Sequence, residues 1–154
     1  MGNYWASITL ESAWPANEAS AVGTLRTLAT AEDAFSHSSG KKNAQDYGTM
    51  DDLSSRGLIP RDLGPTRRGY RFTVDPTDAR KRYLISAVPL VLAKRNDPSF
   101  IPGASWLRKS GAYARGGTGV RSFAVDESGV IRYTDAPLLQ PPTKEEALKW
   151  KSLQ

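Results

Sequence analysis

The longest regular pattern in the chain is a run of apolar residues spaced to lie on one side of an α-helix. They recur at steps of three or four residues, at Ala19, Val22, Leu25, Leu28, Ala31 and Phe35. Apolar side chains at such steps form a single stripe on a helix. The pattern predicts a helix over residues 16–37, about 33 Å long at about 1.5 Å per residue, with Glu18 and Glu32 mostly off the buried stripe.

Four shorter segments alternate between apolar and polar residues, which is typical of β-strands. They span residues 69–74, 82–88, 120–125 and 130–134. Residues 75–78 are predicted to form the turn between the first two, and residues 126–129 the turn between the last two, where Gly129 supplies a positive φ. We expect the helix to pack on the sheet through Leu25, Leu28 and Phe35 on one side and Phe72, Ile85, Phe123 and Ile131 on the other.

Capping and turn residues divide the remainder of the chain. Thr49 is a predicted N-cap of a short helix that ends at Gly57. Residues 89–119 form a long connection rich in glycine and proline, and Thr143 with Glu146 forms a capping box that predicts a last helix through Leu153. We therefore expect an irregular segment at 1–15, a globular domain at 16–140 and a short helix or tail at 141–154.

Composition narrows the class of protein. The chain has 154 residues, which suits one domain with its own core. It has no cysteine, which excludes disulfides, thiol nucleophiles and cysteine-bound zinc. No apolar run approaches the roughly 20 residues that a membrane-spanning helix needs, and residues 1–14 do not read as a secretory signal.

Three segments, taken in order, resemble one family. Residues 17–28 read Asn-Glu-Ala-Ser-Ala-Val-Gly-Thr-Leu-Arg-Thr-Leu, residues 47–60 end in Gly-Leu-Ile-Pro, and residues 126–133 read Asp-Glu-Ser-Gly-Val-Ile-Arg-Tyr. Together they resemble the globular part of type IV pilin-like proteins, including the major pseudopilins of type II secretion. The resemblance covers residues 16–75 and 117–135 best. It implies an α+β fold, with one long N-terminal helix packed on an antiparallel sheet of about four strands, and with a short C-terminal helix added in this chain.

The resemblance also implies a function. Such domains are non-enzymatic structural subunits of a type IV pilus or a type II secretion filament, in the periplasm or on the cell surface. In the family a hydrophobic half-helix precedes the segment at 17–28. We expect this chain to lack it, as a truncated chain, as the globular chain of a split pilin, or as a free-standing relative with another role.

The expected partners are other pilin or pseudopilin subunits, or a separate hydrophobic pilin helix, and no small-molecule substrate. The resemblance places their contact at the start of the long helix, where small residues spaced three to four apart allow another helix to approach closely. The predicted interface comprises Trp14, Ala16, Ala19, Val22 and Gly23.

Charge is unevenly distributed and leaves an alternative function open. Residues 61–121 carry 13 basic and 4 acidic side chains, net +9, whereas the chain as a whole carries 21 basic and 16 acidic, net +5. A basic stretch interleaved with tyrosines suits nucleic acid or an acidic partner. A DNA-binding or adhesive surface domain is therefore the alternative, using Arg67, Arg68, Arg80, Lys81 and Arg82. Strand alternation favours tyrosines that face the helix and arginines that face water.

The sequence gives little sign of catalysis. His37 is the only histidine, and no nucleophile or base is placed beside it, so no enzyme activity is expected. The hairpin turn carries two carboxylates, Asp126 and Glu127, which are weak candidates for calcium because that ion takes six to eight oxygen ligands. A plain hairpin turn without a cofactor is the preferred interpretation.

Overall fold

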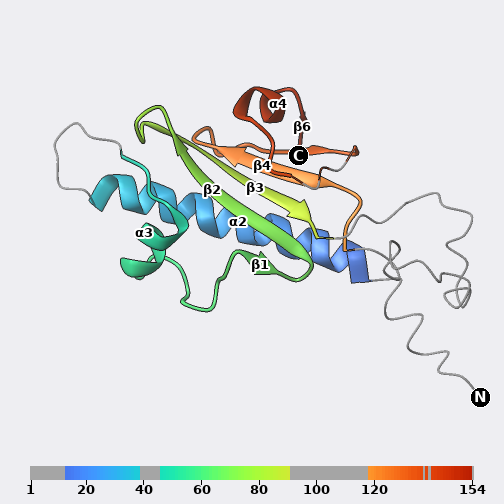
Figure 1. The fold of residues 1–154 in the computed structure, drawn as a ribbon, viewed down its shortest axis with the longest axis horizontal. Helices are drawn as coiled ribbons and strands as arrows, with labels where there is room; N and C mark the ends of the chain where they lie inside the picture. The colour runs from blue at the N-terminus through green and yellow to red at the C-terminus, as the bar shows by residue number, and fades with distance from the viewer. Residues whose placement is uncertain (1–12, 39–45, 91–117, 137, 139, 154) are drawn as a thin grey trace, which may run out of the picture.

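A long helix crosses one face of an antiparallel sheet, and a short helix lies on the other face (Figure 1). The computed structural model describes residues 13–38, 46–90, 118–136, 138 and 140–153. The helices are α2 (Ala13–Ser38), α3 (Met50–Ser55) and α4 (Lys144–Leu148). The strands are β1 (Thr66–Arg67), β2 (Tyr70–Thr77), β3 (Arg82–Pro89), β4 (Ser122–Asp126), β5 (Ile131–Thr134) and β6 (Lys151–Ser152). The predicted α+β class is confirmed.

The sheet has six strands in the order of the chain, each antiparallel to the next. The four predicted strands form its centre, and β1 and β6 add a short strand at each edge, so the predicted count of about four was wrong. Each edge strand is two residues long. Two residues cannot display an alternation, so the sequence pattern carries no signal for them.

The β2–β3 hairpin differs from its prediction. Strand β2 continues to Thr77, where a turn over residues 75–78 was expected, and Pro76 pairs opposite Tyr83. Strand β1 pairs only with the first two residues of β2. Pro76 therefore lies on an open edge of the sheet, where a missing N–H is tolerated.

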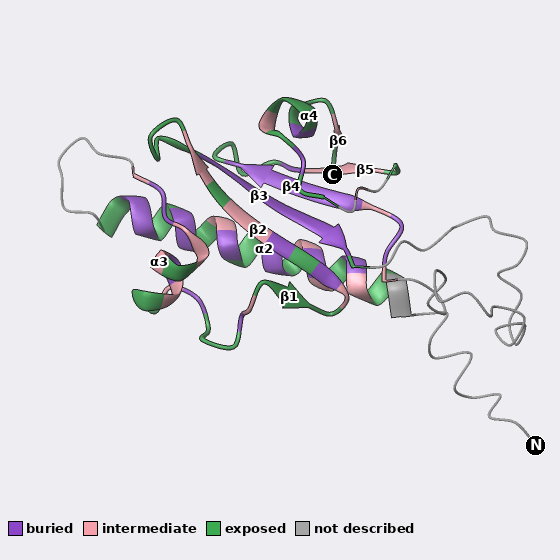
Figure 2. Ribbon diagram, in the orientation of Figure 1, coloured by how far each residue is buried: buried purple, intermediate pink, exposed green. Residues whose placement is uncertain are grey.

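The core lies between α2 and the sheet, as predicted. The seven expected core residues, Leu25, Leu28, Phe35, Phe72, Ile85, Phe123 and Ile131, all belong to one buried cluster. Strands β3 and β4 are buried along almost their whole length, whereas α2 alternates between buried and exposed along its length (Figure 2). On the opposite face of the sheet, Leu84 and Ala124 pack against Ala147 and Trp150 from the α4 region.

In the predicted stripe of α2, Leu25, Leu28, Ala31 and Phe35 are buried, but the first two residues are not. Buried residues recur at alternating steps of three and four, at Glu18, Ala21, Leu25, Leu28, Glu32 and Phe35. Ala19 is exposed and Val22 is half-buried. Steps of three drift around a helix by about 60° each, whereas alternating steps of three and four return to one side. The prediction that Glu18 and Glu32 lie off the stripe was wrong.

The two short helices have the predicted caps but different lengths. Thr49 and Thr143 each form a capping box, with Asp52 and Glu146 respectively. Helix α4 ends at Leu148, and the expected helix through Leu153 was wrong because β6 pairs with β5 instead. The Leu153 N–H donates to the Ile131 carbonyl at 2.8 Å. The open edge of β5 thus supplies the last residues with hydrogen bonds in place of those of a continued helix.

Candidate functional site

The side of α2 that faces away from the sheet is built from small residues without charge. We call it the small-residue face, and it comprises Ala16, Ala19, Gly23, Thr27, Thr30 and Ala34, all of them exposed. At a helical turn of about 100° per residue, these six positions fall within one narrow stripe opposite the core. An exposed helix face usually carries long charged or polar side chains, so this composition is unusual for a surface exposed only to water.

The small-residue face has few unsatisfied polar groups. The Thr27 hydroxyl donates to the Gly23 carbonyl at 3.1 Å, and the Thr30 hydroxyl donates to the Arg26 carbonyl at 2.9 Å. A methyl group added at Gly23 would meet no described atom within 4 Å. Another helix could therefore approach α2 closely here without burying unpaired hydroxyls.

The predicted partner-helix residues are only partly brought together. Ala16, Ala19 and Gly23 lie on the small-residue face. Val22 is half-buried and packs against the core, so it is turned toward the sheet's side of the helix. Trp14 lies in α2, but its side chain lies outside the described residues.

The beginning of α2 is fastened to the sheet by Glu18, a residue that the sequence pattern did not single out. One carboxylate oxygen, Oε1, accepts the backbone N–H groups of Val120 and Arg121 at 2.9 and 3.1 Å. The other, Oε2, lies 3.8 Å from the Arg121 guanidinium. Asn17 adds a hydrogen bond from its side-chain amide to the Thr118 carbonyl at 3.2 Å. These contacts fix the direction in which the small-residue face points.

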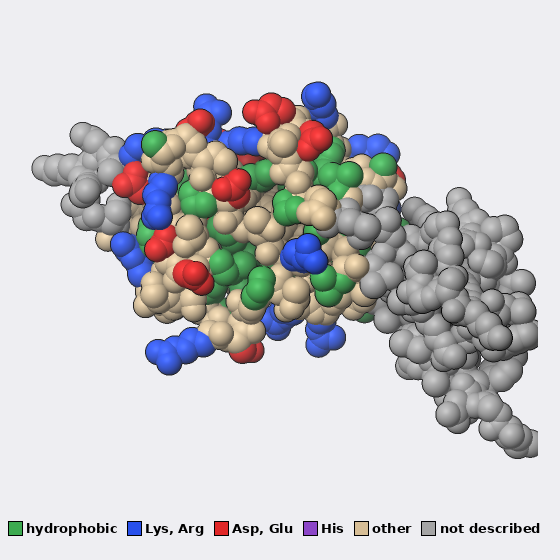
Figure 3. All heavy atoms as spheres, in the orientation of Figure 1, with side chains coloured by type: hydrophobic (Ala, Val, Ile, Leu, Met, Phe, Trp, Pro, Cys, Tyr) green, Lys and Arg blue, Asp and Glu red, His purple; other side chains and the backbone are tan. Residues whose placement is uncertain are grey.

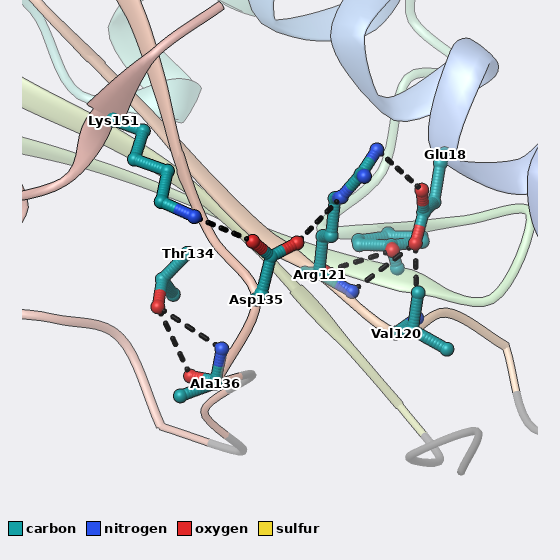
Figure 4. Close-up of polar contacts among 8 residues, drawn as sticks. Glu18, Val120, Arg121, Thr134, Asp135, Ala136 and Lys151 are labelled. Carbon is teal, nitrogen blue, oxygen red and sulfur yellow. Dashed lines mark hydrogen bonds and ion pairs between the residues drawn. The ribbon is translucent and has the colours of Figure 1, made fainter. Parts of the chain in front are cut away.

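Glu18 is the first in a row of four side chains of alternating charge that contact one another in sequence, and the fourth, Lys151, belongs to β6 (Figure 4). The Arg121 Nε donates to Asp135 at 3.0 Å, and the Lys151 Nζ donates to the other oxygen of Asp135 at 3.0 Å. Hydrogen bonds from Lys151 and Arg121 hold the pKa of Asp135 below its ordinary value. Asp135 and Lys151 are exposed, so the outer half of the row contributes little stability. Its inner half joins α2, β4 and the segment after β5.

The five predicted basic residues do not form one surface. Three of them lie at one end of the β2–β3 hairpin, where each is paired with an acid. Arg80 is 3.0 Å from Asp52, and Lys81 is 2.7 Å from Asp46. Arg82 is 3.5 Å from Asp78 and 3.8 Å from Glu127. Arg67 and Arg68 lie at the other end, about seven residues or 23 Å along β2. Acidic and basic side chains are interspersed around the face shown in Figure 3.

The tyrosines of the basic region face the helix, as predicted. Tyr70 is 0% exposed and its hydroxyl donates to the Arg121 carbonyl at 2.9 Å. Burial raises the pKa of Tyr70 above its ordinary value. Tyr83 is likewise buried, while Arg71 and Arg82 are exposed. Neither tyrosine is available for stacking on a base.

The two calcium candidates are engaged by protein groups. One oxygen of Asp126 accepts both the backbone N–H and the hydroxyl of Ser128. Glu127 receives the Lys144 ammonium at 2.7 Å from each carboxylate oxygen. Within the described ranges, no group of three or more His, Cys, Asp or Glu side chains is placed to hold a metal ion. The geometry is that of a hairpin turn tied to α4.

His37 lies at the exposed end of α2. Its Nδ1 is 2.7 Å from the Asp33 carbonyl and 3.6 Å from the Asp33 carboxylate. Both contacts belong to one exposed turn of helix, where the Ser36 hydroxyl also lies 3.5 Å from Nδ1. The long connection at 89–119, for which the sequence predicted no regular structure, lies almost entirely outside the described residues.

Comparison with known proteins found no match for this chain among family models, curated proteins or solved structures. The described helices include none with the length and apolar character needed to cross a membrane.

Proposed function

We propose that this domain is a non-enzymatic structural subunit of a pilin-like or pseudopilin-like filament and that it assembles through the small-residue face of α2. The proposal joins the resemblance of residues 17–28, 47–60 and 126–133 to the geometry of that face. The observation that carries it is an exposed side of a 26-residue helix with six small, uncharged residues in line. Helices pack most closely where such residues meet.

Two features of the fold support this use of α2. The helix is held along one side by the core and at its beginning by Glu18, so the exposed side is presented on a rigid support. Arg26, Asp33 and His37 border the face on one side and leave the other border without charge. The partner is another pilin-like subunit or a separate hydrophobic pilin helix, and the proposed location is the periplasm or a surface filament.

The alternative function, binding of DNA or another acidic surface, receives less support from the geometry. Three of the five residues it requires are already paired with acids, and the other two lie at the opposite end of the hairpin. A nucleic-acid site of this kind depends on several unpaired cations close together.

The test supplies a hydrophobic prepilin-type helix, either fused in helical register before α2 or co-expressed as a second chain. Association is measured by pull-down, and filaments are sought by electron microscopy. We expect association in at least one format. A folded domain that associates in neither format would remove the assembly function and leave the fold standing.

Substitutions locate the contact. Ala19→Arg and Ala34→Arg place a long cation on the small-residue face and are expected to weaken association at least tenfold, with little change in stability because both sites are exposed. Ala136→Arg is the matched control, because Ala136 is an exposed alanine outside α2. Equal effects of all three changes would show that the contact lies elsewhere.

A further inference from the structure

The carboxyl group of Glu32 is fully buried with half of its hydrogen-bonding capacity unused. Its side chain projects from near the C-terminal end of the buried stripe of α2 and is 0% exposed. Oε2 accepts the Gly48 N–H at 2.8 Å, whereas Oε1 has no hydrogen-bond partner among the described residues. An ionised carboxylate in a buried site is stable only when several donors or a cation compensate for lost water. Among the described residues, Glu32 has one donor.

Two cations near Glu32 are paired with other acids. Arg80 pairs with Asp52 at 3.0 Å, and Lys81 pairs with Asp46 at 2.7 Å. The titratable and charged groups around Glu32 come from every element packed on it, namely Asp33 and His37 on α2, Asp46, Tyr47, Asp52 and Arg56 in residues 46–56, and Arg80, Lys81, Tyr83, Asp126 and Glu127 from the sheet.

The balance of these effects favours the neutral acid. The pKa of Glu32 is raised from 4.5 to about 7, chiefly by burial. The hydrogen bond from Gly48 lowers this pKa, the charge of Asp52 raises it, and the charge of Arg80 lowers it. The rings of Tyr47 and Tyr83 meet edge to face with centroids 4.7 Å apart, and both groups are neutral near pH 7. Glu32 therefore lies in surroundings that are mostly uncharged or internally paired.

Glu32 holds a segment that has few other polar contacts with α2. We call residues 46–56 the docked segment. Within the described residues, its hydrogen bonds to α2 are Gly48 to Glu32 and the Arg56 guanidinium to the Ser38 hydroxyl at 3.0 Å. Gly48 sits so close to Phe35 that an added methyl group would lie 3.2 Å from the ring. The segment covers Phe35 and buries its own Leu53.

The other attachment of the docked segment is a strained turn. Asp78, Ala79 and Arg80 follow one another with φ of 49°, 53° and 68°. Such angles are unfavourable for residues with a side chain and persist only where surrounding contacts enforce them. The Arg80 carbonyl accepts the Tyr47 N–H at 2.8 Å, and its guanidinium binds Asp52. The turn is thus held both by contacts with the docked segment and by its own hydrogen bond from the Lys81 N–H to the Asp78 carbonyl at 3.0 Å.

We propose that residues 46–56 are a proton-controlled flap, docked on α2 while Glu32 carries a proton and released when Glu32 is ionised. The neutral acid fits a buried site with one donor, and the charged form requires water that only opening admits. Opening also frees the 78–80 turn from the contacts that constrain it. The flap when released exposes Phe35 and Leu53. This inference does not depend on the proposed assembly function.

The raised pKa of Glu32 determines whether docking strengthens or weakens as the pH rises. Glu32 binds its proton more tightly in the docked state than in an opened, hydrated state with an ordinary glutamate pKa. Its stabilising effect on docking is therefore complete below about pH 4.5 and is lost as pH rises through about 7. Between pH 5 and pH 8, these two pKa values correspond to an increase of about 70-fold in the opening equilibrium.

Amide hydrogen exchange resolved by residue tests the flap in the whole chain. The amides of Gly48, Leu53 and Arg56 report docking, and amides of β3 and β4 report global unfolding. After correction for the intrinsic pH dependence of exchange, we expect opening of the docked segment to increase by at least tenfold from pH 5 to pH 8 and to require less free energy than opening of the strands at each pH. The strand amides should show at most the same relative increase, because global unfolding also exposes Glu32. In Glu32→Gln, opening should stay constant over this range.

Two controls separate Glu32 from other causes. His37→Gln removes the only histidine, a residue type that changes charge in the same range, and Glu145→Gln makes the same change at an exposed site. Both should keep the wild-type pH dependence. Opening that is independent of pH in the wild type, or docked-segment amides that exchange only through the same global opening as the strand amides at every pH, would overturn the proposal.

A second measurement covers the case in which Glu32→Gln does not fold. The side-chain carboxyl carbon of Glu32 is followed by NMR in the wild-type chain between pH 3 and pH 9. A titration midpoint that matches the midpoint of flap opening supports the proposal. A midpoint near the ordinary value of glutamate, or one unrelated to opening, contradicts it.

Discussion

Two glutamates lie on the same buried stripe of α2, four turns apart, and differ in how their charge is compensated. Glu18 accepts two backbone N–H groups and faces a guanidinium. Glu32 accepts one backbone N–H and leaves an oxygen without a partner in the described structure. Both are buried to a similar degree, at 7% and 0% exposure. Burial alone therefore does not determine what a buried acid does.

The difference lies in the partner strand or segment that each glutamate meets. Val120 and Arg121, the two residues just before β4, present consecutive N–H groups to Glu18, which makes a firm connection between helix and sheet. Gly48 presents a single N–H to Glu32, and the nearby cations are held by Asp46 and Asp52. The start of α2 is thus a permanent support for the small-residue face, and its later turns carry a contact that depends on pH.

The largest expected effect comes from removing Glu18. Glu18→Ala leaves two buried N–H groups without an acceptor and is expected to lower the free energy of unfolding by about 3–4 kcal/mol, because unsatisfied buried donors and a broken buried ion pair are costly. Denaturant unfolding measures it. Glu145→Ala on exposed α4 is the control and should change stability by less than about 0.5 kcal/mol. A small loss at Glu18 would show that water replaces its contacts.

The second prediction concerns the pH dependence of global stability. The raised pKa of Glu32 makes the folded chain bind more protons than the unfolded chain between about pH 4.5 and pH 7. The free energy of unfolding should therefore fall by about 2–3 kcal/mol from pH 5 to pH 8 through this residue. Glu32→Gln should remove that part of the decline.

At pH 8 the two glutamates should respond to amide substitution with opposite sign. Glu32→Gln is expected to stabilise the chain because it removes an uncompensated charge, whereas Glu18→Gln is expected to destabilise it because the new amide would face the Arg121 guanidinium. Thermal unfolding of both variants at pH 8 measures the contrast. The same sign in both would mean that the two sites are electrostatically alike.

A smaller loss of stability is expected from a substitution that tests how closely Gly48 packs against Phe35 and Asp52. Gly48→Ala places a methyl group 3.1 Å from the Asp52 Cβ and 3.2 Å from the Phe35 ring, and overpacking of this kind costs about 1–2 kcal/mol. Gly64→Ala is the matched control, because a methyl group there meets no described atom within 4 Å. If Gly48→Ala were neutral, the docked segment would be loosely held even at low pH.

The smallest expected change in stability comes from a substitution at Gly23, on the exposed side of α2. Gly23→Ala is expected to raise the free energy of unfolding by about 0.5–1 kcal/mol, because glycine in a helix is less favourable than alanine and the site is open. The substitution should leave the pH dependence of the free energy of unfolding unchanged. In the assembly assay it should weaken association if a partner helix approaches α2 closely at this position. Stabilisation with unaltered association would place the contact elsewhere on α2.

The sequence by itself determined the class of fold and most of the core. Alternation in four segments and a helical stripe were enough to predict the central strands, the start of α2 to within three residues, and the presence of Leu28 and Phe123 in one core. These features depend on the period of each element, which is local. The caps at Thr49 and Thr143 were predicted for the same reason, because a capping box is complete within four residues.

The tertiary structure alone decided that Glu18 and Glu32 belong to the buried side of α2, and what these acids do. Two glutamates at core positions look like surface residues in the sequence, because a carboxylate is buried only where donors from distant segments reach it. Those donors are the amides of Val120 and Arg121 for Glu18 and of Gly48 for Glu32. The edge strands and the pairing of Arg80, Lys81 and Arg82 with acids likewise join residues far apart in the chain. No local pattern contains such contacts, so they arise only when the chain has folded.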